Sequence, residues 1–323
     1  MNRLDTQIWL QHAWLNRLQS FLLLAVLGGL LALLGWLLWG VDGVLMLLLF
    51  GFVTVVLSPA VTPRLVMRLY GARPLSPAQA PAMYAVVREL ARRAGLPAVP
   101  TVYYVPSGIV NAFAVGRRAG AAVAVTDGLL RVLDRREQIG VLAHEISHIG
   151  ANDMSVMGLA DMFSRLTSLL SLFGQLLLVV NLPLMLVSDV AVNWFAILAL
   201  IFAPTLSALA QLGLSRTREY HADLNAARLT GDPEGLARAL VKIERVQGRW
   251  LERVFLPGRS VPDPSLLRTH PPTEERVARL MALQQPTDEG SWTIDAGPTS
   301  WAELPEDGRI MRRPRWRISG LWY

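Results

Sequence analysis

Four long windows without any charged residue constrain the fold of this chain more than any other feature of its sequence. They run over 18–41, 43–63, 166–188 and 190–215, and they are 24, 21, 23 and 26 residues long. Each is rich in Leu and Val and reaches the roughly 20 residues that a helix needs to cross a bilayer core. The sequence therefore predicts four transmembrane helices and excludes a purely soluble, fibrous or disordered protein.

The first window has an alternative interpretation as a cleaved signal peptide. A lead-in of 17 residues, an apolar run longer than a signal sequence needs and the lack of an A-x-A site favour an uncleaved anchor. The chain contains no cysteine, so it offers neither disulfides nor a thiol nucleophile.

The basic residues predict the orientation in the membrane. All 31 Lys and Arg lie in 1–17, 64–165 and 216–323, whereas the links between paired windows carry one charge each, Asp42 and Asp189. By the positive-inside rule we expect a multi-pass plasma (inner) membrane protein with both termini and the basic segments in the cytoplasm. The net charge of +6 then reflects topology and affinity for anionic lipid head groups, and we expect no nucleic-acid partner.

The segments outside the windows predict a mainly α-helical domain with a small β-sheet, so the fold class is an α+β membrane protein. Strand-like runs cover 101–105, 109–115 and 121–126, and helical patterns cover 81–95, 215–229, 233–254 and 273–283. Asp134, followed by Glu137, predicts a capping box at the start of another helix. The expected parts are a cytoplasmic N-terminus (1–17), a transmembrane hairpin (18–63), a cytoplasmic part (64–165), a second hairpin (166–215), a second cytoplasmic part (216–284) and a flexible tail (285–323).

The run Ala143-His144-Glu145-Ile146-Ser147-His148 carries the clearest chemistry. On a helix, His144 and His148 lie one turn apart on the same face, so both imidazoles can bind one metal ion. Glu145 adjoins the first ligand, where it can hold and deprotonate a metal-bound water. Two ordinary surface histidines are the alternative interpretation, which the position of the motif inside a capped helix disfavours.

A catalytic zinc needs a third protein ligand, and the run 215–223 contains the candidates. Glu219 and Asp223 share a helical face, so Glu219 can bind the metal while Asp223 accepts an N–H from a ligating imidazole. Alternatively, both carboxylates simply pair with Arg216 and Arg218. His221 is a rival ligand, but two residues from Glu219 it points to another face.

With these residues in place, the chain resembles the HtpX-type membrane zinc metallopeptidases, which share a clan with the CAAX prenyl proteases. The matching elements are Asn111-Ala112-Phe113-Ala114, Val125-Thr126-Asp127-Gly128-Leu129-Leu130, His144-Glu145-Ile146-Ser147-His148, Ser215-Arg216-Thr217-Arg218-Glu219-Tyr220 with Ala222-Asp223, and Thr269-His270-Pro271-Pro272. The resemblance covers about residues 20–283. It implies a zincin-like peptidase domain with a HEXXH plus Glu (gluzincin-like) site, one Zn²⁺ per subunit bound by His144, His148 and Glu219, Glu145 as general base, and a cytoplasmic active site.

Two further residues are candidates with equally plausible structural interpretations. His270 could stabilise the oxyanion of the reaction, because Pro271 and Pro272 stiffen the chain beside it, or it could belong to an ordinary helix-start turn. Asn111 lies in a strand-like run that could pair with an extended substrate, or the run could be an ordinary packed strand.

The leading functional hypothesis is a zinc endopeptidase that cleaves misfolded or destabilised membrane proteins and unfolded polypeptides at the cytoplasmic face, in quality control. A processing protease for a lipidated or precursor substrate is the enzymatic alternative, and a catalytically silent membrane scaffold or a small transporter are alternatives from other classes. A transporter should place ionisable residues within its spans, and the four windows have none. No oligomeric state follows from the sequence.

Overall fold

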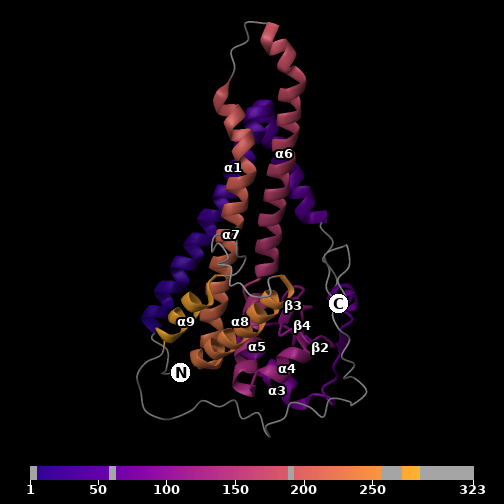
Figure 1. Ribbon diagram of the computed structural model, residues 1–323, viewed down its shortest axis with the longest axis vertical. Coiled ribbons are helices and arrows are strands. Elements are labelled where there is room, and N and C mark those ends of the chain that lie inside the picture. Colours follow the sequence, from indigo (N-terminus) through magenta and orange to yellow (C-terminus); the bar gives the residue numbers. More distant parts are fainter. Residues whose placement is uncertain (1–5, 58–62, 188–192, 256–270, 284–323) are drawn as a thin grey trace. The chain divides into compact units, whose positions relative to one another are not determined.

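The computed structural model of the chain describes residues 6–57, 63–187, 193–255 and 271–283 (Figure 1). The chain divides into two compact units. The apolar unit comprises Leu15–Pro59 and Ser155–Thr217, and the sheet unit comprises Met1–Trp14, Ala60–Met154 and Arg218–Tyr323. Asp189 and the tail from residue 285 lie outside the described residues.

Three helices within the described residues are long and apolar enough to span a membrane, so the expected count of four is not confirmed. They are α1 (Thr6–Leu57), α6 (Asp153–Val187) and α7 (Trp194–Thr230). The difference arises because the first apolar window and most of the second lie within α1.

Helix α1 is nevertheless interrupted between those two windows. Trp39 and Gly40 have non-helical backbone angles, and Gly40 adopts a φ of +64° that only glycine tolerates well. A Cβ atom on Gly43 would lie 2.2 Å from the carbonyl oxygen of Gly35. In a straight helix, residues eight apart are separated by about 12 Å. The backbone therefore turns back on itself at Trp39 and Gly40 (Figure 1), two to three residues before the charge at Asp42.

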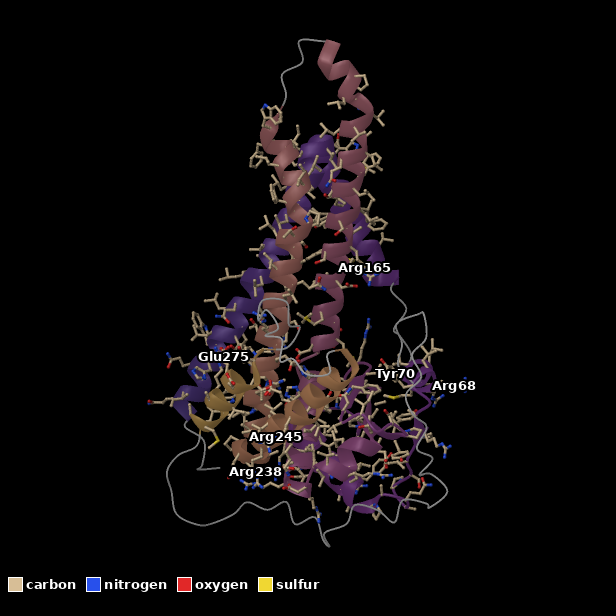
Figure 2. All side chains as sticks on the ribbon, viewed as in Figure 1. Arg68, Tyr70, Arg165, Arg238, Arg245 and Glu275 are labelled. Carbon is tan, nitrogen blue, oxygen red and sulfur yellow. The ribbon has the colours of Figure 1, made fainter. Side chains whose placement is uncertain are left out.

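Within the apolar unit, small polar side chains join α6 to α7. Ser207 donates a hydrogen bond of 3.0 Å to Ser164, and Gln175 donates one of 3.0 Å to Ser171. Ser171 donates in turn to the backbone carbonyl of Leu200. In a hydrocarbon environment such pairs satisfy polar groups that lipid cannot. By contrast, the Arg165–Asp161 pair on α6 is exposed (Figure 2).

The sheet unit contains a small mixed sheet, as predicted. Its strand order is β1 (Arg73–Pro74), β2 (Thr101–Val105), β4 (Ala122–Thr126) and β3 (Ala112–Val115). Strands β2 and β4 are parallel, whereas β3 runs antiparallel to β4. In the described part of the chain, β3 therefore forms one edge of the sheet.

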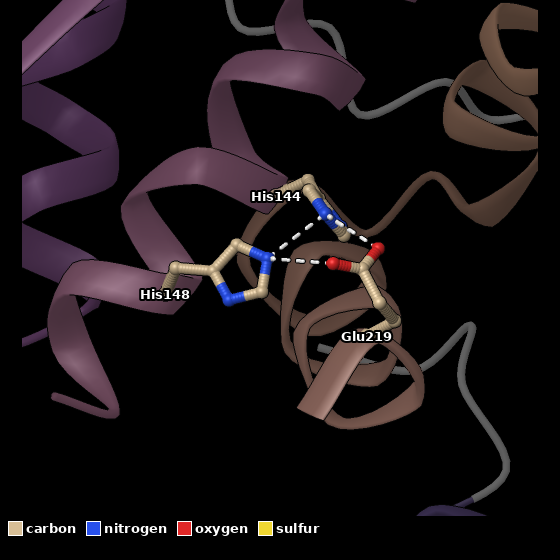
Figure 3. A group of neighbouring side chains, drawn as sticks. All are labelled: His144, His148 and Glu219. Atoms are coloured by element: carbon tan, nitrogen blue, oxygen red, sulfur yellow. Dashed lines mark hydrogen bonds and ion pairs between the residues drawn. The ribbon is translucent and has the colours of Figure 1, made fainter. Parts of the chain in front are cut away.

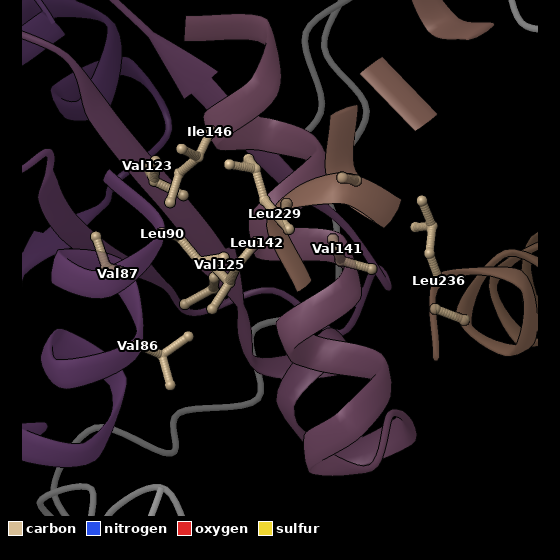
Figure 4. Close-up of a cluster of buried hydrophobic side chains, with 14 of the residues drawn as sticks. Val86, Val87, Leu90, Val123, Val125, Val141, Leu142, Ile146, Leu229 and Leu236 are labelled. Atoms are coloured by element: carbon tan, nitrogen blue, oxygen red, sulfur yellow. The ribbon is translucent and has the colours of Figure 1, made fainter. Parts of the chain in front are cut away.

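The helices of the sheet unit are α2 (Pro63–Leu69), α3 (Pro81–Arg93), α4 (Asp127–Val132), α5 (Arg135–Gly150), α8 (Pro233–Phe255) and α9 (Thr273–Met281), together with the last turns of α7. Helix α8 packs on α5, and α9 packs on α8. The main core lies between the sheet, α3 and α5, where apolar side chains such as Leu90, Val123, Leu142 and Ile146 are buried (Figure 4). Met67 of α2 is buried against the opposite face.

The start of α5 is fixed by the predicted capping box. The backbone N–H of Glu137 donates to Asp134 at 3.0 Å, and the backbone N–H of Asp134 donates to Glu137 at 2.9 Å. Lys242 of α8, the only lysine in the chain, donates to the buried carboxylate of Glu137 at 2.7 Å. Gly140 allows this close packing, because a Cβ there would lie 2.8 Å from the backbone nitrogen of Leu236. Helix α5 is thus held firmly where its metal-binding motif begins.

Candidate metal centre

The structure brings together the three residues that the sequence identifies as metal ligands (Figure 3). On α5, the Nε2 atoms of His144 and His148 are 3.1 Å apart. On α7, the two carboxylate oxygens of Glu219 lie 3.6 Å from Nε2 of His144 and 3.7 Å from Nε2 of His148. All three side chains belong to the sheet unit.

A carboxylate contacts the Nδ1 atom of each imidazole, the ring nitrogen that does not face Glu219. Nδ1 of His144 lies 3.0 Å from Asp223, and Nδ1 of His148 lies 2.6 Å from Asp153. Each Nδ1 atom thus has a carboxylate beside it, and each Nε2 atom is left on the side of Glu219, where it can bind a metal ion.

This arrangement of donors fits a bound zinc ion. Bond lengths of about 2.0–2.1 Å and tetrahedral angles would separate the ligand atoms by roughly 3.3 Å, close to the distances between the three side chains. The surroundings also favour positive charge. Burial alone would lower the pKa of His144, but Asp223 and Glu219 outweigh it and raise this pKa to about 10.

Two arginines support the carboxylates. Arg276 of α9 makes two hydrogen bonds of 2.7 Å to Asp223 and lies 3.2 Å from Glu219. Burial opposes ionisation of Asp223, but the Arg276 guanidinium holds the pKa of Asp223 below its ordinary value. Arg218 of α7 donates to Asp153. In the alternative interpretation, Glu219 and Asp223 pair with Arg216 and Arg218. Its Arg218 part is wrong, since Arg218 binds Asp153 and it is Arg276 that contacts both carboxylates.

Asp153 and Arg276 are site residues that the sequence analysis missed. Asp153 follows His148 by five residues, just beyond the end of α5, and a search for acidic residues one turn past the motif could have found it. Arg276 is 57 residues from Glu219 in the sequence and carries no local signal.

Glu145 lies at the same centre, beside His144 on α5. Burial raises the pKa of Glu145 above its ordinary value, and the nearby His144 and His148 only partly offset this effect. The nearby backbone of Ala114 in β3 also opposes this rise in the pKa of Glu145. Glu145 therefore lies close both to the two histidines and to the edge strand β3.

His221 lies elsewhere on α7, as predicted from its spacing. The two ring nitrogens of His221 lie 3.2 and 3.4 Å from the side-chain amide of Asn225. His221 is not part of the group formed by His144, His148 and Glu219. The side chain of Asn111 is exposed just before β3, while its backbone N–H and carbonyl are both bonded to Thr126. Its own backbone is therefore engaged within the sheet. His270 lies outside the described residues.

Comparison with known proteins agrees with this site. A model of peptidase family M48 matches residues 77–284. A "Protease HtpX homolog" from Pyrococcus abyssi is 36% identical over 82% of this chain and 95% of its own length. Another, from Pelotomaculum thermopropionicum, is 36% identical over 83% of this chain and 99% of its own length. A crystal structure of Ste24p from S. mikatae has 21% identity and a TM-score of 0.46, covering 83% of this chain and 66% of that one.

Proposed function

Because this chain belongs to peptidase family M48, with HtpX proteases among its relatives, we propose that it is a membrane-integrated, zinc-dependent endopeptidase. The observation that carries the proposal is the convergence of His144, His148 and Glu219 beside Glu145. A zinc ion held by these three ligands supplies a Lewis acid that polarises the scissile carbonyl and acidifies a water molecule.

Three carboxylate residues of the chain have the remaining roles in the proposed reaction. Glu145 accepts the proton of the attacking water and passes it to the leaving nitrogen. The raised pKa of its buried carboxyl suits this exchange, because a general base works best when its pKa approaches the working pH. Asp223 and Asp153 keep the two imidazoles in place during the reaction.

The free edge of β3 supports a binding mode for the substrate. Thr126 donates a backbone hydrogen bond to the carbonyl of Asn111, so the alternation of the antiparallel β3–β4 pair directs the backbone groups of Ala112 and Ala114 away from β4. An extended peptide adds there as a further strand and passes Glu145. The exposed side chain of Asn111 lies at the start of this edge and contacts the substrate in our proposal, and His270 stabilises the oxyanion.

We propose four membrane spans, with the site and both termini in the cytoplasm. Support comes from the reversal of α1 at Gly40 and from the confinement of basic residues to three segments. Substrates are destabilised membrane proteins with loose segments at that surface, because pairing with β3 needs an extended backbone.

The test uses the purified full-length protein in detergent. We expect one zinc per chain, cleavage of casein and of a destabilised membrane protein, loss of cleavage on chelation and recovery when zinc is returned. A zinc-loaded protein that cleaves neither substrate would refute the proposal. Mass spectrometry of the products should find several sites with apolar residues near the scissile bond, whereas one strict site would favour the processing protease.

A further inference from the structure

The first turns of α1 belong to the sheet unit, although the rest of this helix belongs to the apolar unit. Ile8 and Trp9 pack against the main core of the sheet unit, and Ala13 is buried. Residues 7–13, which we call the N-terminal clamp, therefore form part of the unit that contains the metal ligands.

The clamp holds α7 beside the ligand Glu219. The indole N–H of Trp9 donates to the backbone carbonyl of Leu224 at 3.2 Å, one residue after Asp223. The guanidinium of Arg228, one turn further along α7, lies 5.3 Å from the centre of the Trp9 ring. A cation over an indole face is a favourable contact, so Trp9 binds α7 at two successive turns.

Helix α9 adds to this support (Figure 2 labels its Glu275). A small cavity next to Asp223 is lined by His12 of the clamp and by Arg279 of α9. Arg279 also lies 3.8 Å from the ring centre of Tyr220, the neighbour of Glu219. The part of α7 that carries Glu219 and Asp223 thus contacts both the clamp and α9, which meet at this cavity.

We propose that the N-terminal clamp sets the position of Glu219 and Asp223, and that Trp9 is a positioning residue for the metal site. The proposal rests on the proposed zinc function. Its physical basis is that ligands bind a metal tightly only when their support fixes them to within about 0.5 Å. A shift of α7 at Leu224 moves Asp223 directly, and Asp223 orients His144.

The chain supplies a matched control for Trp9. Trp14 is on the same helix but is 62% exposed. The experiment compares the wild type with three full-length variants, Trp9→Ala, Trp9→Phe and Trp14→Ala. Chelator competition gives the zinc dissociation constant of each protein, and cleavage of a casein peptide gives kcat and KM. The melting temperature of the metal-free protein is measured as well.

We expect Trp9→Ala to bind zinc about tenfold more weakly, as is usual when a residue that supports a metal ligand is lost. The kcat of this variant should fall by a larger factor than its KM changes. Trp9→Phe keeps an aromatic ring for Arg228 but loses the indole N–H, so its zinc affinity should lie between those of Trp9→Ala and the wild type. This variant also provides the test if Trp9→Ala does not fold. Trp14→Ala should match the wild type.

Two results would overturn the inference: zinc affinity of the Trp9 variants equal to that of Trp14→Ala, or a lower melting temperature with unchanged zinc affinity. Failure of the wild type itself to bind zinc would instead refute the proposed function. The two failures are thus distinguishable.

Discussion

Replacing Asp153 by Asn tests the carboxylate support of the metal site most directly. Asp153 lies 2.6 Å from Nδ1 of His148 and also binds Arg218, and the two side chains of this ion pair are only 5% and 10% exposed. The substitution keeps the shape of the side chain but removes its charge. It should therefore have two separable consequences, one for the metal and one for folding.

The magnitudes follow from these contacts. Loss of a carboxylate behind a ligating imidazole typically weakens metal binding by about 10–100-fold, or roughly 1.4–2.8 kcal/mol. Arg218 is left as a buried charge without its carboxylate, which costs about 3–5 kcal/mol of folding free energy. Removing that charge as well, in Asp153→Asn with Arg218→Gln, should restore most of the stability without restoring zinc affinity.

The assay combines urea unfolding of the metal-free protein with chelator competition for zinc. Asp161→Asn is the control, because its exposed pair with Arg165 should contribute less than about 1 kcal/mol. An unchanged zinc affinity in Asp153→Asn would refute the role of this carboxylate. A double variant no more stable than the single one would refute the argument about the buried charge.

Three further predictions concern the base, the third ligand and the topology. Glu145→Gln should keep zinc, because the ligands remain, yet lose nearly all peptidase activity, which metal analysis and a cleavage assay would measure together. Glu219→Ala should lower zinc content far more than His221→Ala, because only Glu219 faces both imidazoles; equal losses would contradict the ligand assignment. Since the chain has no cysteine, single cysteines can be introduced for labelling: position 42 should react from outside the cell and position 117 only after permeabilisation, and the reverse result would invert the topology.

The sequence predicts those features whose cause lies within one or two helical turns. The capping box of Asp134 and Glu137 and the shared face of His144 and His148 depend on local spacing, so both appear in the structure as expected. The pairing of Asp223 with His144 also follows from spacing, once Glu219 is placed opposite the motif.

Features set by distant contacts could not be predicted in this way. Arg276 reaches Asp223 only because α9 packs beside α7, and Trp9 reaches Leu224 across 215 positions of sequence. The two-residue strand β1 is too short to show any periodicity. The reversal in α1 lies at Trp39 and Gly40 because glycine tolerates the backbone angle required, whereas the charge pattern pointed only to Asp42.

The division of the metal ligands between α5 and α7 has a consequence for how the enzyme is made. After His148, the ribosome adds 70 residues, including all of α6 and most of α7, before it reaches Glu219. At about 5–20 residues per second, this takes roughly 4–14 s. During that interval the growing chain has two ligands of its metal site but not the third. Newly made molecules therefore bring the three residues together only after the apolar segment of α6 and most of α7 have been synthesised.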